Sequence, residues 1–267
     1  MKNNYKMIIA YDGTRYYGWE HQPNTDMTIQ GKLESVLSQM TGEQIDVIGA
    51  GRTDAGVHAK GMAANAHMQT SMTPDEICDY MNRYLPEDIC VMEVRIASER
   101  FHSRYNAMGK TYCYTCYVGD KKPVFNRKYV HITGAVPDVE AMKKAASYLV
   151  GVHDFASFCN VRTNAKDTVR TVHEITIKEI PMDKFQASNW GQENSNLENE
   201  KEIVIRVTGN GFLYNMVRII AGTLIRVGRG FYEPEKIRDI LEAKEHTSEG
   251  ITAPPNGLVL VSIDYPL

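Results

Sequence analysis

The order of extended and helical segments in the first hundred residues constrains the fold more than any other feature of this chain. Extended patterns and amphipathic helices follow one another as β-α-β-β-α-β. The second helix is marked clearly, because Thr73 stands at the N-cap, Pro74 follows it and Glu76 closes a capping box. Two strands in direct succession favour a ferredoxin-like arrangement over a doubly wound parallel sheet.

The second half of the chain repeats this order with one additional helix. In the first half we expect strands at 5–13, 43–51, 62–70 and 88–97 and helices at 28–42 and 73–86. In the second half we expect strands at 110–118, 170–180, 202–209 and 257–265 and helices at 138–151, 212–228 and 233–246. A long polar segment, residues 181–201, is expected to be a surface insertion.

These patterns predict an α/β (α+β) protein. Two ferredoxin-like halves, residues 1–104 and 105–267, would form a mixed, largely antiparallel central sheet with an active-site cleft between them. The alternative is the doubly wound parallel sheet, which would need a helix between successive strands.

Composition indicates a cytoplasmic protein. No apolar run of the 267 residues approaches the roughly 18–20 residues of a membrane span. The apolar stretch near the N-terminus is too short for a signal peptide. The five cysteines are odd in number, which argues against a disulfide framework. Cys113 and Cys116 form a CxxC on an expected strand, where residues three apart face opposite sides, so we expect no metal there.

Basic residues are unevenly distributed along this weakly acidic chain. The net charge is −3, yet residues 100–128 hold seven Lys or Arg and a single acid, Asp120. Residues 203–232 hold four arginines and no acid. This segregation allows a basic face for a polyanion on an acidic protein.

The glycine-rich segment GAGRTDAGVHAKG, residues 49–61, is the strongest candidate for a functional loop. Its glycines do not match the GxGxxG dinucleotide fingerprint, and the GK[ST] end of a P-loop is absent. It could instead be a plain connection between strands, in which Gly49, Gly51 and Gly56 supply positive φ and the charged side chains face water.

Arg52 and Asp54 favour chemistry over a plain connection. Small neighbours let the Asp54 carboxylate project, and Arg52, two residues away, could hold it ionised. A single ionised carboxylate suits nucleophilic attack, whereas an acid-dependent glycoside hydrolase needs a second carboxylate that this loop lacks.

The sequence resembles the tRNA pseudouridine synthase A (TruA) family. The resemblance rests on this loop and on five further stretches in order along the chain, namely YDGTRYYGWEHQP, FHSRYNAMGKTYCY, GVHDFASF, GNGFLYNMVRIIAG and TAPPNGLVLVSIDY. It implies the pseudouridine synthase fold and isomerisation of uridine to pseudouridine at positions 38, 39 and 40 of the tRNA anticodon stem-loop. It also implies a homodimer that uses neither cofactor nor metal.

The resemblance also assigns site residues. The catalytic nucleophile of the family matches Asp54, with attack on the sugar or on the base left open. Tyr112 matches the residue that stacks on the substrate, Arg52 an arginine that engages the aspartate or a phosphate, and Arg170 another arginine near the aspartate. His58 is not required by this chemistry. The alternative function is a non-catalytic RNA-binding module of RRM-like halves, although the RNP aromatic pattern is absent.

Overall fold

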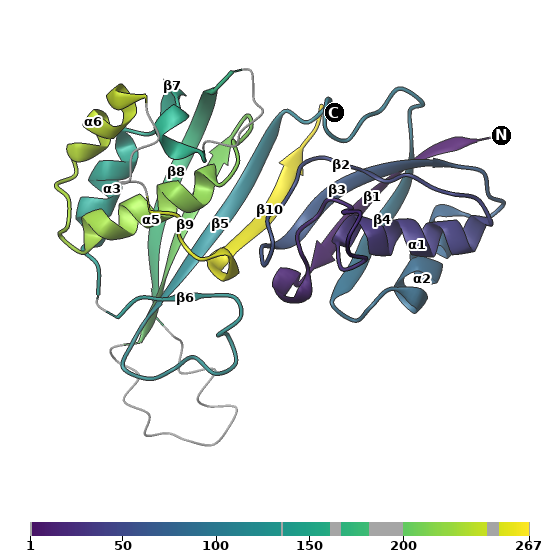
Figure 1. Ribbon diagram of the computed structural model, residues 1–267, viewed down its shortest axis with the longest axis horizontal. Helices are drawn as coiled ribbons and strands as arrows, with labels where there is room; N and C mark the ends of the chain where they lie inside the picture. The colour runs from purple at the N-terminus through teal and green to yellow at the C-terminus, as the bar shows by residue number, and fades with distance from the viewer. Residues whose placement is uncertain (1, 135, 161–166, 182–199, 245–250, 267) are drawn as a thin grey trace. The chain divides into compact units, whose positions relative to one another are not determined.

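The computed structural model describes residues 2–134, 136–160, 167–181, 200–244 and 251–266. The chain divides into two compact units, coloured by residue number in Figure 1. Unit 1 consists of Met1–Thr111 together with Val259–Leu267, and unit 2 of Tyr112–Leu258.

Unit 1 has the order of elements that the sequence predicts. Its elements are β1 (Asn3–Tyr11), the 3-10 turn η1 (Gly13–Arg15), α1 (Ile29–Thr41), β2 (Ile48–Gly49), β3 (His58–Met68), α2 (Pro74–Tyr84), β4 (Ile89–Ala97) and β10 (Leu258–Asp264). The strand β1 pairs antiparallel with both β3 and β4, and β2 pairs antiparallel with β3. This is the ferredoxin-like strand order, and β10 adds a parallel pairing to the start of β3.

The two helices of unit 1 begin where their capping residues stand, and they lie side by side in Figure 1. The Thr28 hydroxyl accepts the Gly31 N–H at the start of α1, and Gly42 ends that helix with a φ of 73°. Thr73 and Glu76 form the predicted capping box of α2, with Pro74 at its first position. Local chemistry therefore accounts for the start of both helices and for the end of α1.

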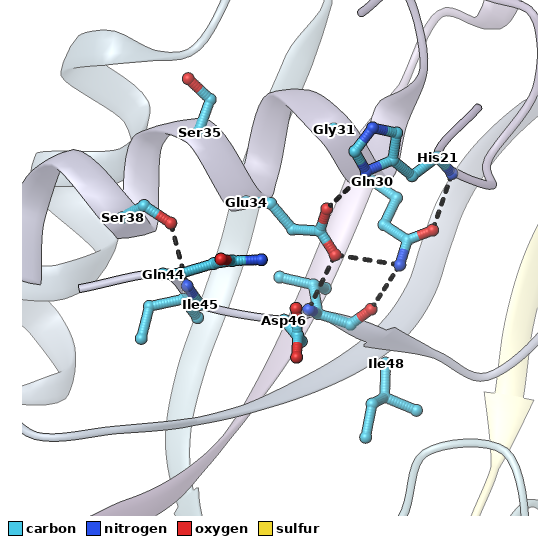
Figure 2. Close-up of a pocket in the computed structure, with 11 residues that line it drawn as sticks. His21, Gln30, Gly31, Glu34, Ser35, Ser38, Gln44, Ile45, Asp46 and Ile48 are labelled. Carbon is cyan, nitrogen blue, oxygen red and sulfur yellow. Dashed lines mark hydrogen bonds and ion pairs between the residues drawn. The ribbon is translucent and has the colours of Figure 1, made fainter. Parts of the chain in front are cut away.

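The expected strand at 43–51 is mostly irregular, and only β2 within it is a strand. Side chains of α1 take the place of a strand partner, as Figure 2 shows. The Val47 N–H donates to Glu34 Oε1 at 3.0 Å, and the Val47 carbonyl accepts from Gln30 Nε2 at 2.9 Å. Since the backbone groups are satisfied by the helix, the segment does not need to join the sheet.

Unit 2 contains a run of mostly antiparallel strands with helices packed against them. Its elements are β5 (Gly109–Val118), β6 (His131–Ile132), α3 (Val139–Ser147), β7 (Gly151–Asp154), η2 (Ala156–Phe158), β8 (Val169–Pro181), β9 (Lys201–Gly209), α5 (Met216–Gly228), α6 (Lys236–Ala243) and η3 (Pro255–Gly257). The strands run in the order β5-β9-β8-β7, and β6 pairs parallel with β5. Both units thus confirm the predicted mixed, largely antiparallel α/β class.

Three details of the second half differ from the sequence prediction, and a fourth prediction is not tested. The helix expected to end at Gly151 ends at Ser147, and Gly151, with a φ of 116°, begins β7 instead. The helix expected from 212 begins at Met216, because Asn215 takes the left-handed conformation. The last strand, β10, pairs with β3 of unit 1. The segment 181–201 was expected to be an insertion, and 182–199 lies outside the described residues.

All five cysteines are free, and Cys113 and Cys116 both lie on β5. Among the helices in the described ranges, none combines the length and hydropathy that crossing a bilayer requires.

Candidate active site

A tight turn presents Asp54. The Asp54 carbonyl accepts the Val57 N–H at 3.1 Å, and Gly56, third in this four-residue turn, has a φ of 78°. A positive φ at that position is the reason for glycine there. Asp54 itself is half-buried, so the residue is neither fully enclosed in the core nor fully exposed to solvent.

The residue before Asp54 is fixed from two directions. Thr53 is buried, and its hydroxyl shares a 2.8 Å hydrogen bond with the Tyr11 hydroxyl at the end of β1. Its carbonyl accepts the Trp19 N–H at 3.0 Å. The backbone on the N-terminal side of Asp54 is therefore anchored before any ligand binds.

Close packing at two glycines completes this anchor. A Cβ on Gly18, whose φ is 97°, would lie 2.7 Å from the Thr53 carbonyl oxygen. A Cβ on Gly49 would meet the Trp19 indole at 2.5 Å. We define the Asp54 clamp as Tyr11, Gly18, Trp19, Thr53 and Gly56; the stretch YDGTRYYGW thus supports the loop that carries Asp54.

The glycines of the loop do not all serve the purpose expected from the sequence. Of Gly49, Gly51 and Gly56, only Gly56 has a positive φ. Gly49 is needed for space, because a Cβ there would meet the Trp19 indole, whereas a Cβ on Gly51 would lie 2.9 Å from Lys110 Nζ, the flexible end of a side chain that can move. Lys110 Nζ donates to the Ala50 carbonyl at 2.9 Å, which places a positive charge at the base of the loop.

Arg52 is turned outward in this structure. Its guanidinium forms an ion pair with Glu20, and both side chains are largely exposed. The loop therefore carries a cation on its solvent side. The expectation that Arg52 engages Asp54 or a phosphate stays a prediction.

His58 is part of the packing between the turn after β1 and the start of β3. It is buried at the start of β3, and its Nδ1 accepts the Gly13 N–H at 3.0 Å. The same nitrogen lies 3.2 Å from Oδ1 of Asp12. The ring ties the turn after β1 to β3.

In unit 2, Tyr112 and Phe212 form an aromatic pair. The Tyr112 side chain on β5 is 8% exposed, and its ring meets Phe212 edge to face, with 5.4 Å between centroids. Phe212 is half-buried in the loop after β9. Phe212 therefore packs on the ring that the resemblance selects.

Arg170 lies beside the same loop of unit 2. Its guanidinium donates to the carbonyls of Asp167, at 3.0 Å, and Val169, at 2.6 Å. Its side chain is 3.9 Å from the Cβ position of Gly211, next to Phe212. Within unit 2 the structure therefore gathers Arg170 and the aromatic pair around one loop.

A buried amide network in unit 1 was missed by sequence reasoning. Asn65 on β3 is fully buried; its Oδ1 accepts from the Ser103 N–H at 2.9 Å and hydroxyl at 2.6 Å, and its Nδ2 donates to Asn4 at 3.0 Å. The network fixes the turn at 102–106. The signal was a polar residue in the apolar strand MAANAHM.

Asn65→Leu is expected to lower the free energy of unfolding by about 2–4 kcal/mol, because it leaves several buried polar groups without partners. Urea unfolding measures the change. The matched control is Asn106→Ala on the same turn, where an exposed amide accepts the His102 N–H at 2.7 Å. If both variants lost the same free energy of unfolding, burial of the Asn65 amide would not explain its contribution to stability.

The sequence matches known proteins over almost its whole length. A family model described as tRNA pseudouridine synthase matches residues 7–106 and 145–266. The chain belongs to the tRNA pseudouridine synthase family. As a member of the tRNA pseudouridine synthase family, it is an isomerase.

Individual relatives support the assignment to the tRNA pseudouridine synthase family. The chain is similar to tRNA pseudouridine synthase A of Bacillus sp. (strain KSM-64), with 46% identity over 98% of this chain and 100% of the relative. It is similar to tRNA pseudouridine synthase A 1 of Clostridium tetani, with 44% identity over 98% and 99% of the two chains. It is also similar to tRNA pseudouridine synthase A 2 of Bacillus cereus, with 41% identity over 98% and 100%.

Proposed function

We propose that this protein converts uridine to pseudouridine at positions 38, 39 and 40 of the tRNA anticodon stem-loop, with Asp54 as the nucleophile and without a cofactor. The observation that carries the proposal is the Asp54 clamp, which anchors the backbone on both sides of one half-buried carboxylate. Fixing a nucleophile in advance lowers the barrier, because less freedom is lost in the transition state. We further propose that the protein acts in the cytoplasm as a homodimer.

The chemistry requires a bond from Asp54 to the substrate. The carboxylate attacks either C1′ of the ribose, so that uracil leaves as an anion, or C6 of the base; both routes remain open. In the first route C5 of the turned uracil displaces Asp54 from C1′. In the second route the N1–C1′ bond breaks, C5 joins C1′ and Asp54 is expelled from C6. In both routes N1 gains a proton, the C5 proton is lost and the carboxylate is regenerated. The target nucleoside must leave its stack first, at a cost of about a few kcal/mol.

Tyr112 and Arg170 are proposed as substrate-binding residues of the same reaction. Stacking of a base on an aromatic ring is worth on the order of 1–3 kcal/mol, and the Phe212 contact holds the Tyr112 ring in place. We propose that Arg52 and Arg170 contact the phosphate backbone or orient the carboxylate. Their positive charge is consistent with either role.

Tyr112→Phe is expected to bind stem-loop RNA within a few fold of the parent protein and to turn over about 100-fold more slowly. The ring face is kept, whereas the hydroxyl that would move the C5 proton is lost. Tyr114→Phe removes a hydroxyl from the same strand, where it donates to the Pro254 carbonyl, and serves as control. Normal turnover by Tyr112→Phe would exclude a catalytic hydroxyl.

The proposed function is tested by release of tritium from anticodon stem-loop RNA labelled with 5-³H-uridine. The enzyme is expected to release tritium without added metal or nucleotide. A non-catalytic RNA-binding module would bind the RNA and release none. Mapping of the product would show which of the three positions had been converted.

A further inference from the structure

A hollow of about 250 Å³ in unit 1 opens beside the loop that carries Asp54. Its walls come from three segments that are far apart in sequence. The side chains that matter chemically are Trp19, Glu20, Arg52, His102, Arg104 and Tyr105. Two guanidinium groups and several aromatic rings therefore face one small concavity.

The aromatic side of the hollow is unusually accessible. Tyr105 is 79% exposed, and its ring stacks on the His102 ring with 4.1 Å between centroids and 31° between planes. A large exposed ring on a soluble protein is a natural platform for a base, because every base has a π-face. Arg104, also exposed, stands next to it in the sequence.

The turn that displays these side chains is rigid. His102 Nδ1 accepts the N–H groups of Arg104, at 3.2 Å, and Tyr105, at 3.3 Å. Ser103, between His102 and Arg104 in the sequence, is fully buried, and its hydroxyl donates a hydrogen bond to Asn65 Oδ1. Little conformational entropy is lost when such a turn binds a ligand, so its contacts favour affinity.

The Glu20 carboxylate competes with an incoming phosphate for the Arg52 guanidinium. In this structure its carboxylate pairs with the Arg52 guanidinium. A phosphate that approaches Arg52 has to displace this carboxylate or bind beside it. An exposed ion pair is weak, so the competition lowers the affinity for the phosphate without blocking it.

We propose that this hollow binds a nucleotide that flanks the target uridine, with its phosphate between Arg52 and Arg104 and its base on Tyr105, and that Glu20 reduces the affinity by competing for Arg52. The proposal rests on the proposed function and specifies where the RNA strand adjoining the reacting nucleotide lies. Arginine contacts to phosphate position the strand, and stacking accepts any base.

Equilibrium binding of anticodon stem-loop RNA over a range of salt concentrations tests the two attractive contacts. Tyr105→Ala is expected to weaken binding roughly tenfold and Tyr105→Phe to leave it unchanged. Arg104→Gln is expected to weaken binding and to reduce the slope of log K against log salt by about 0.7–0.9. The matched controls are Tyr84→Ala and Arg83→Gln, an exposed pair on α2, which should bind as the parent does.

Glu20→Gln tests the competing charge. It is expected to strengthen RNA binding by about two- to fivefold, because the ion pair it removes is a weak exposed one. Glu43→Gln removes one negative charge from an exposed position of the same unit and should change binding much less. Equal effects of the two variants would show that only net charge matters and would overturn the role of Glu20.

Binding and tritium release separate this proposal from the proposed function. If the parent protein releases tritium but the Tyr105→Ala and Arg104→Gln variants bind RNA like their controls, the hollow does not hold a flanking nucleotide. If these variants weaken binding as expected but the parent protein releases no tritium, the proposed function is wrong and the hollow remains an RNA contact.

Discussion

Asp54→Asn is expected to abolish tritium release, with kcat reduced by a factor of about 10⁴ or more. The amide has nearly the same shape but is not a nucleophile, so the covalent step has no substitute. RNA affinity should stay within a few fold, because the proposed phosphate and stacking contacts remain. Tritium release under enzyme excess, which removes any effect of product release, measures the chemical step.

The control for this variant is Asp46→Asn, which neutralises an exposed carboxylate of the same unit. It should release tritium at the parent rate and unfold at the parent urea concentration. Substantial turnover by Asp54→Asn, in a preparation free of parent enzyme, would show that another group carries the reaction.

Gly18→Ala is expected to lower kcat/KM by about 100-fold and also to lower the stability of the fold. The added Cβ would lie 2.7 Å from the Thr53 carbonyl oxygen, and the φ of 97° is unfavourable for alanine. The backbone before Asp54 has to move, and a shift of about 1 Å at a reacting group can cost roughly 100-fold in rate. The strain should also lower the free energy of unfolding by about 1–3 kcal/mol.

Gly42→Ala is the matched control for Gly18→Ala. Gly42 has a φ of 73°, also unfavourable for alanine, but no atom lies within 4 Å of its Cβ position. It should therefore cost about 1 kcal/mol of stability and leave turnover unchanged. A similar loss of activity in both variants would mean that backbone strain, and not displacement of the Asp54 loop, explains the effect.

The fold could be predicted where local chemistry decides it. The α2 capping box at Thr73 and the glycine after α1 are short-range signals, and both were confirmed. The prediction of a full strand at 43–51 was wrong, because the backbone there forms hydrogen bonds with the Glu34 and Gln30 side chains. No local sequence pattern reveals such a contact. The pairing of β10 with β3 joins residues about two hundred positions apart, which the element order alone does not specify.

The sequence selects Asp54 as the candidate nucleophile, but it does not reveal the contacts that hold the Asp54 loop in place. Asp54 could be selected because a single carboxylate among small residues suits nucleophilic attack. Its anchors, Tyr11 and Trp19, lie far away in sequence and could be found only from the hydrogen bonds they make. The pairing of Arg52 with Glu20 was likewise not anticipated, since either charge had several possible partners. The roles of Arg52, Tyr112 and Arg170, and a cleft between the halves, stay predictions.

The central claim is that Asp54 makes a covalent bond to the target uridine, and the most direct measurement is to locate that bond. Stem-loop RNA with fluorine in place of hydrogen at C5 of the target uridine has no C5 proton to lose, so the step after C–C bond formation is blocked in the route through C6. In the route through C1′ the electron-withdrawing fluorine slows the attack of C5 that displaces Asp54, so the ester persists for longer. Mass spectrometry of the digested complex is predicted to find the nucleotide joined to the peptide that contains Asp54, and to find no adduct with Asp54→Asn. An adduct on another residue, or one that persists in the Asp54→Asn variant, would contradict the account.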